Sequence, residues 1–155
     1  MDQHPLPGTP ALPAARPAAR TAARTVRLAT SFVSGDAQAD VLAGELGYDP
    51  RDPFAVTMDL FASGGRVTWT FARDLLAEGL YEPSGDGDVH VWPCLSSTGE
   101  AVVVIELTSP EGTAMLQTSS RLVRRFVDDT CAVVPLGHES RHLAVDDLVA
   151  RLLQG

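Results

Sequence analysis

The stretch TWTFARDLLAEGLYEPSGDGDVHVW, from Thr68 to Trp92, decides the fold of this chain. Apolar residues alternate with polar ones up to Phe71, which is the two-residue period of a strand with one buried face. From Arg73 the leucines fall at spacings that one helical face can gather, and Gly79 is placed to end that helix. Alternation returns at Val89 after a proline- and glycine-rich loop. The stretch therefore predicts a strand, a short helix, a turn and a second strand in succession.

The flanking segments extend this pattern into a sheet. Alternation runs from Phe54 to Leu60 and resumes at Val67 after Ser63-Gly64-Gly65, which predicts a hairpin whose second strand buries Val67, Trp69 and Phe71. The run from Val102 to Ile105 is apolar on both faces, so it should be a central strand covered on each side. Pro93 should place its strand at a sheet edge or a bulge.

The N-terminal part of the chain predicts a tail, a first strand and a polar loop. Residues 1–24 are rich in Pro, Ala and Arg, and we expect them to be disordered. A single domain should cover residues 25–155, beginning with a strand near Thr25. A polar loop is expected from Ser34 to Asp40. The segment from Val41 to Tyr48 fits either a short strand or an irregular crossing.

The C-terminal half predicts helices. Ser109-Pro110-Glu111 has the residue types of a helix start, with a hydroxyl cap, a proline and an acid. A second helix is expected from about Ser119 to Asp129. A last helix is expected from about Val145, with Leu148, Val149, Leu152 and Leu153 buried. Hairpins followed by helices indicate an α+β fold, with antiparallel β-sheets packed against C-terminal helices.

Composition limits the classes of function. The chain has 155 residues and a net charge of −8, and residues 28–155 hold eight arginines against nineteen acids. Such an acidic body disfavours nucleic acid, whose affinity rests on neutralised phosphates. No apolar run approaches the roughly 20 residues that span a bilayer, and no secretory signal is apparent, so we expect a cytoplasmic protein. Its cysteines, Cys94 and Cys131, should be reduced and lie in or near the core.

Two motifs could hold a metal ion. His138-Glu139-Ser140-Arg141-His142 matches H-E-x-x-H, the signature of zinc peptidases, but Gly137 and Pro135 lie just upstream. We interpret it as a polar loop leading into a strand. Asp86-Gly87-Asp88 with His90 has the composition of a tight turn and too few oxygen ligands for a cation cage. We predict no metal and no cofactor.

Other candidate residues suggest contact with proteins. Arg121, Arg124 and Arg125 could bind an acidic partner, although the solvated face of an amphipathic helix is the favoured interpretation. Trp92 could be an exposed interface anchor, although a packed position is the favoured interpretation. The sequence shows neither a nucleophile with a neighbouring base nor a phosphate-binding loop.

Four segments of the chain resemble the SsgA-like family of actinobacterial sporulation and cell-division proteins. The likeness covers the chain from about Tyr48 onward, and its matching segments are Asp52–Val56, Trp69–Leu80, Gly85–Val89 with Val91–Pro93, and Ser109–Gly112. The resemblance implies a fold similar to the eukaryotic whirly proteins and association as a homotrimer. It also implies a non-enzymatic regulator or adaptor, cytoplasmic and located at division septa, that helps to position or assemble the FtsZ-based septum. The expected partners are FtsZ, directly or indirectly, and other SsgA-like proteins.

The candidate partner surface consists of Arg73, Asp74 and Trp92. The alternative function is single-stranded nucleic-acid binding by a whirly-like module. A zinc hydrolase that uses His138, Glu139 and His142 is a more distant alternative.

Overall fold

The computed structural model describes residues 24–32, 41–85 and 87–154. The expected N-terminal disorder, the loop Ser34–Asp40 and Asp86 lie outside these residues, except for Arg24. The strands are β1 (Arg24–Phe32), β2 (Val41–Tyr48), β3 (Ala55–Ala62), β4 (Gly65–Ala72), β5 (Ser84–Gly85), β6 (Val89–Leu95), β7 (Ala101–Ser109) and β8 (Gly112–Ser119). The helices are α1 (Arg73–Gly79), α2 (Ser120–Val133) and α3 (Glu139–Leu153).

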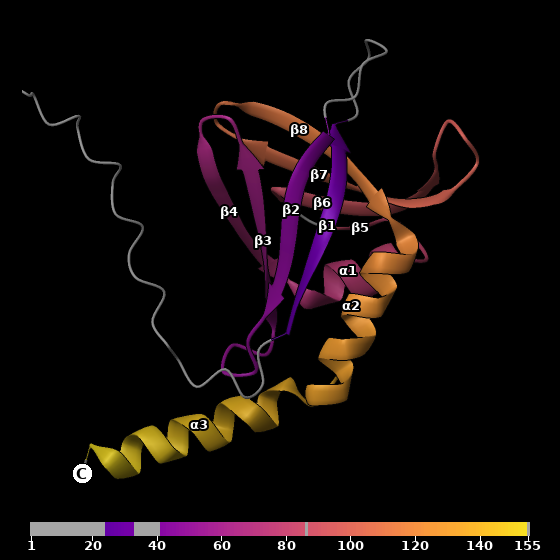
Figure 1. The fold of residues 1–155 in the computed structure, drawn as a ribbon. Helices are drawn as coiled ribbons and strands as arrows, with labels where there is room; N and C mark the ends of the chain where they lie inside the picture. The colour runs from indigo at the N-terminus through magenta and orange to yellow at the C-terminus, as the bar shows by residue number, and fades with distance from the viewer. Residues whose placement is uncertain (1–23, 33–40, 86, 155) are drawn as a thin grey trace, which may run out of the picture.

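The strands form one antiparallel sheet in the order β4-β3-β2-β1-β8-β7-β6-β5. Strand β1 joins the two halves, because it pairs with β2 along most of its length and with β8 only from Thr30 to Phe32. Beyond that short junction the halves diverge, so β1–β4 and β5–β8 run across one another (Figure 1). The α+β architecture expected from the sequence is confirmed, and β2 resolves the uncertain segment as a strand.

The β3–β4 hairpin follows the predicted alternation. Val56 pairs with Phe71 and Met58 pairs with Trp69. Val56, Met58 and Phe71 are buried and Trp69 is half-buried, but Val67 is exposed. The expectation that Val67 is buried is therefore wrong. Its partner Leu60 belongs to the core, but Val67 lies on the end strand of the sheet and lines an open, mainly apolar hollow of about 320 Å³.

Strand β7 has the predicted central position. It pairs with β6 on one side and β8 on the other, and Val102, Val103, Val104 and Ile105 are all buried. On the outer side of β6, the short strand β5 reaches only His90 and Val91. Pro93 lies beyond that point and, among the described strands, pairs with β7 alone, so it stands at a sheet edge, as predicted.

The predicted helix at Ser109-Pro110-Glu111 is wrong. The segment is the turn between β7 and β8, in which the Glu111 N–H donates to the Ser109 hydroxyl at 3.3 Å. Gly112 has a φ of 143°, which starts the return strand. Leu116 and Thr118 are buried in alternation with more exposed neighbours, so β8 follows the period of a strand. A hydroxyl, a proline and an acid serve a turn as well as a helix cap.

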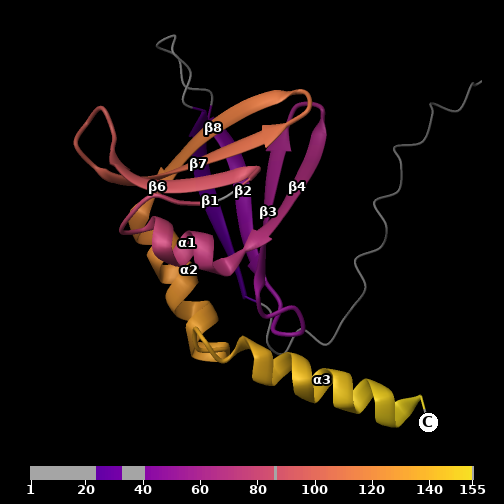
Figure 2. The same cartoon turned by 180° about the vertical axis from the view of Figure 1, so that it is seen from behind.

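Helices α1 and α2 close the sheet around the core (Figures 1 and 2). The second predicted helix is confirmed, and α2 continues for a further turn to Val133. Val123, Phe126 and Val127 of α2 pack with Leu76 of α1 and with the inward side chains of the strands. One contiguous core therefore holds both halves of the sheet and two helices.

Helix α3 differs from the prediction. It begins at Glu139, well before Val145, and projects away from the sheet (Figure 2). Val149, Leu152 and Leu153 are exposed, so their expected burial is wrong. Their helical spacing was detectable in the sequence, but spacing alone does not say whether another element covers the stripe.

The cysteines do not share one environment. Cys131 is half-buried and packs against the core, as expected. Cys94 is exposed, so its predicted burial is wrong. It lies near the end of β6, beyond the residues that β5 covers.

Candidate interaction surface

Arg73, the first predicted surface residue, is completely buried. It is the first residue of α1, directly after β4, and its backbone N–H donates to the Phe54 carbonyl at 2.7 Å. That bond ties the start of α1 to the chain just before β3. The expectation that Arg73 is exposed is wrong, and its side chain cannot contact a partner in this conformation.

The Arg73 side chain joins α1 to the α2–α3 corner. Its Nη2 donates to Glu139 Oε1 at 2.7 Å, and its Nη1 donates to the Val134 carbonyl at 2.7 Å and to Thr130 Oγ1 at 3.4 Å. The guanidinium also lies over the Tyr48 ring, 5.0 Å from its centroid. Residues that are distant in sequence are thus fixed around one buried positive charge.

Glu139 stays ionised beside Arg73. Burial acts to raise the pKa of this carboxyl, but the hydrogen bond from Arg73 and the backbone N–H donors of Glu139 and Gly137 hold the pKa below its usual value. The position at the start of α3 also places the negative charge near the positive end of a helix. Glu139 is therefore charged at neutral pH, and its bond to Arg73 holds the start of α3 to α1.

The Tyr48 ring packs against the Arg73 guanidinium of this ion pair. Its hydroxyl donates to the Pro53 carbonyl at 2.9 Å. Burial raises the pKa of Tyr48 to about 12, and Glu139 contributes in the same direction while Arg73 opposes it. The neutral phenol is therefore the form that the folded protein favours.

An alkaline titration tests this environment. Because the pKa is higher in the folded chain, the stability that Tyr48 contributes is complete below pH 10 and is lost as the pH rises to about 12. We expect the free energy of unfolding to fall by about 2–3 kcal/mol over that interval. Urea unfolding at several pH values measures it. Tyr48→Phe should flatten the decline and the exposed Tyr81→Phe should not; equal slopes in wild type and Tyr48→Phe would contradict the assignment.

The H-E-x-x-H motif lies in a helix, so its interpretation as a loop leading into a strand is wrong. His138 immediately precedes α3, and Glu139 and His142 belong to it. In a zinc peptidase the glutamate must reach a metal-bound water. Here Glu139 is 5% exposed and bonded to Arg73, so the motif contributes an ion pair. Within the described residues, no group of three or more His, Cys, Asp or Glu could hold a metal ion.

The other predicted surface residues lie apart from each other. Asp74 is exposed on α1. Gly79 of α1 packs against Val91 of β6, and because side chains alternate along a strand, Trp92 points to the opposite face of the sheet. Half-buried Trp92 lines a hollow of about 250 Å³ with Pro83, His90 and Glu106. The structure thus does not combine Arg73, Asp74 and Trp92 into one surface.

Sequence reasoning missed the link between Arg73 and Glu139. They are 66 positions apart, and no local periodicity connects them. The available signal was a charged residue at the junction of a predicted strand and helix, where the chain enters the core.

No helix in the described part of the chain is long and apolar enough to cross a membrane.

These features define a class of α+β protein in which one bent antiparallel sheet is closed by helices and an ion pair buried under them. Comparison with known proteins identifies the family to which the chain belongs. Residues 42–139 match the family model described as Streptomyces sporulation and cell division protein, SsgA. The chain therefore belongs to the SsgA family.

Individual relatives cover most of the chain. The sporulation-specific cell division protein SsgB of Streptomyces coelicolor is 47% identical over 78% of this chain and 88% of its own length. SsgB of Salinispora tropica is 44% identical, over 84% of this chain and 92% of its own length. A solved structure from work relating mutations in SsgB to longitudinal cell division during sporulation of Streptomyces coelicolor is also similar. Its TM-score is 0.74 at 42% identity, and the match covers 77% of this chain and 94% of that one.

Proposed function

We propose that this protein is a non-enzymatic adaptor of sporulation-specific cell division that helps to position or assemble the FtsZ-based septum. The observation that carries the proposal is the likeness to SsgB proteins over most of both chains. In this proposal the protein works in the cytoplasm at division septa, as a homotrimer, and contacts FtsZ directly or through other SsgA-like proteins. It uses no metal ion or cofactor and does not bind nucleic acid.

The buried architecture supports a role in contact rather than reaction. Glu139 is the residue of the zinc-peptidase motif that would act on water, but its carboxylate is ion-paired with Arg73. The described residues leave hollows and exposed side chains at the surface, which is where a partner can bind. We propose Asp74 and the hollow around Trp92 as two separate contact points.

Deleting the gene from a sporulating actinomycete tests the function. We expect aerial hyphae with few or no sporulation septa, and loss of the regular FtsZ rings that precede them. Fluorescent FtsZ imaged in the deletion strain and in the complemented strain measures this. Normal ring spacing and normal septa in the deletion strain would refute the proposal, and a sizing run on the purified chain tests the trimer independently.

Substitutions at the two contact points should separate folding from partner contact. Asp74→Arg reverses an exposed charge, and Trp92→Ala removes the indole ring that lines the hollow. Since interface tryptophans can contribute more than 2 kcal/mol to binding, we expect Trp92→Ala to weaken partner binding by about thirtyfold. Binding to purified FtsZ and to SsgA-like proteins, together with septum counts, provides the measurement.

Glu111→Arg is the matched control for Asp74→Arg, since Glu111 is an exposed acid on the β7–β8 turn. Trp92→Phe keeps an aromatic wall and guards against unfolding of the alanine variant. Unchanged binding and septation in folded Asp74→Arg and Trp92→Ala would show that these residues are not the contact points.

A further inference from the structure

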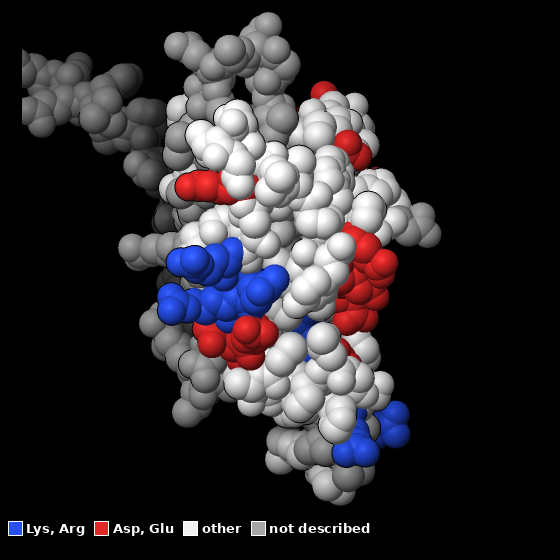
Figure 3. All heavy atoms as spheres, turned by 90° about the vertical axis from the view of Figure 1, so that its right-hand side faces the viewer, with Lys and Arg blue, Asp and Glu red and all other residues white. Residues whose placement is uncertain are grey.

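Arginine side chains gather on the outer face of α2 (Figure 3). Arg124 and Arg125 follow Arg121 by three and four positions, so the three side chains lie on neighbouring turns of one helical face. Arg124 and Arg125 are exposed, as is Arg121, while Val123, Phe126 and Val127 on the other face are buried in the core. The positive face is therefore held rigidly by a helix that cannot rotate.

These arginines have no ion-pair partner among the described residues. Arg51, Arg66 and Arg73 each pair with an acid, but among the described residues none of the α2 arginines forms an ion pair. The first turn of α2 contains no acid, and Arg121 lies instead at the positive end of the helix dipole. Such an arrangement costs helix stability, because that end favours negative charge. A compensating negative charge from outside the molecule would remove this cost.

Tyr81 adds an aromatic surface to the arginine face. It follows α1, is 71% exposed, and lies under the Arg124 guanidinium at 5.6 Å from the ring centroid. The arginine is thereby oriented without being neutralised. An exposed aromatic beside free guanidinium groups can receive an apolar side chain next to carboxylates.

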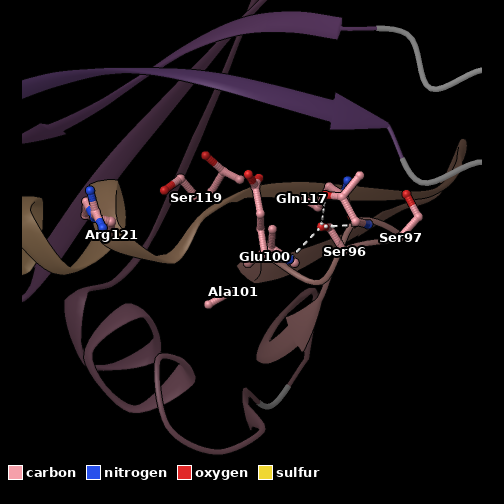
Figure 4. Close-up of a pocket in the computed structure, with 10 residues that line it drawn as sticks. Ser96, Ser97, Glu100, Ala101, Gln117, Ser119 and Arg121 are labelled. Carbon is pink, nitrogen blue, oxygen red and sulfur yellow. Dashed lines mark hydrogen bonds between the residues drawn. The ribbon is translucent and has the colours of Figure 1, made fainter.

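A polar hollow of about 700 Å³ continues from Arg121 toward the β6–β7 turn (Figure 4). Ser97, Gln117 and Ser119 line it with hydroxyl and amide groups, which can hydrogen-bond to a peptide backbone. The Ser96 hydroxyl is already bonded within the turn, to the N–H groups of Thr98 and Glu100. Glu100 also lies on its wall, so the hollow favours a neutral polar segment over a second run of acids. The arginine face and the hollow together suit an extended chain.

We propose that the face formed by Arg121, Arg124, Arg125 and Tyr81 binds an acidic segment of a partner protein that also carries an apolar side chain. The inference rests on the proposed function, in which the protein acts by contacting other proteins, and it names the chemistry of one such partner.

An acidic protein segment fits this face better than a nucleic acid does. Asp128 lies on the next turn of the same helix, and Figure 3 shows acidic side chains beside the basic cluster. A long polyphosphate would have to pass over these acids, and over a chain whose net charge is −8. A short segment with two or three carboxylates can stay within the arginines.

A fluorescent twelve-residue peptide with three glutamates and one central phenylalanine provides the probe. Its binding to the purified full-length chain is measured by fluorescence polarisation, beside a peptide with glutamine in place of each glutamate. We expect binding that weakens with salt and a glutamine peptide that binds at least about tenfold more weakly. R124Q/R125Q should weaken binding by about tenfold, within the range for two exposed ion pairs.

R141Q/R151Q is the matched control, because it removes the same charge from exposed positions on α3 and should change affinity by less than about twofold. Tyr81→Ala should weaken the phenylalanine peptide but not a version with alanine at that position. Equal losses in the two double variants, or failure of the peptide to bind, would overturn the inference. Tighter binding of an oligothymidine or of anionic phosphatidylglycerol vesicles through Arg124 and Arg125 would also overturn it.

The cellular readout keeps this inference separate from the proposed function. If wild-type protein restores septa to the deletion strain but the peptide does not bind, the inference fails and the function stands. If the peptide binds through Arg124 and Arg125 but deletion leaves septation normal, the binding site is supported and the proposed role in septation is refuted.

Discussion

Arg73→Met is expected to lower the free energy of unfolding by about 3–5 kcal/mol, because it leaves the Glu139 carboxylate buried without its partner. The same change removes the donors to the Val134 carbonyl and to Thr130. Urea unfolding followed by tryptophan fluorescence measures the loss. The α2–α3 corner depends on these bonds, so faster hydrogen exchange at the start of α3 should accompany it.

Arg66→Met is the matched control for burial. Arg66 pairs with Asp59 at 2.7 Å, the same distance as in the buried pair, but its side chain is 50% exposed. That variant should lose no more than about 1 kcal/mol. The double variant Arg73→Met/Glu139→Met should recover much of the loss, because it leaves no unpaired charge. Equal losses at Arg66 and Arg73 would contradict the structural role assigned to the buried pair.

Gly85→Ala is expected to destabilise the protein by about 3–5 kcal/mol, through strain and collision together. Gly85 has a φ of 132°, which L-residues rarely adopt. A Cβ there would also collide with the Val89 carbonyl oxygen and approach His90 Cα to 2.8 Å. These are backbone atoms of β6, so no side-chain rotation relieves the contact. Thermal unfolding and urea unfolding both report the change.

Gly87→Ala separates the two causes. Gly87 also has a positive φ, 101°, but a Cβ there would meet nothing within 4 Å. Its variant should lose only the strain component, about 1–3 kcal/mol. If Gly85→Ala and Gly87→Ala cost the same, the close packing of β5 on β6 does not contribute to stability.

Elements that bury a periodic face could be predicted from the sequence. The alternation around Met58 and Phe71 gave the correct hairpin, and the doubly apolar run at Val103 gave the correct central strand. In these segments the pattern of apolar and polar residues over a few positions shows which face of the strand is buried. Gly79 ends α1 as predicted, but the structure requires a glycine there for a distant reason, because a Cβ would collide with Val91 of β6.

Elements whose signals are ambiguous could not be predicted in this way. Ser109-Pro110-Glu111 has the chemistry of both a helix cap and a turn, and only pairing of Leu107 with Ala114 selects the turn. The proline and glycine before His138 suggested a loop, but α3 starts immediately after them. A short segment can fit either a turn or a helix, and contacts with the rest of the chain decide which of the two forms.

The candidate site depended still more on distant contacts. Arg73 resembles a surface residue in the sequence, and its burial is decided by Glu139, Val134 and Tyr48, which lie in other elements. Asp74 and Trp92 remain predicted contact points. The α2 arginines were visible as a cluster, but their lack of acidic partners required the three-dimensional arrangement.

The order in which Arg73 meets its partners has a consequence during translation. Thr130, Val134 and Glu139 follow it by 57, 61 and 66 positions, so the ribosome must synthesise them before the guanidinium can be satisfied. Until then, the nascent sheet cannot close over this positive charge without leaving it unpaired. A nonsense mutation between Val134 and Glu139 would make that state permanent, and such a product would be a substrate for cellular proteases.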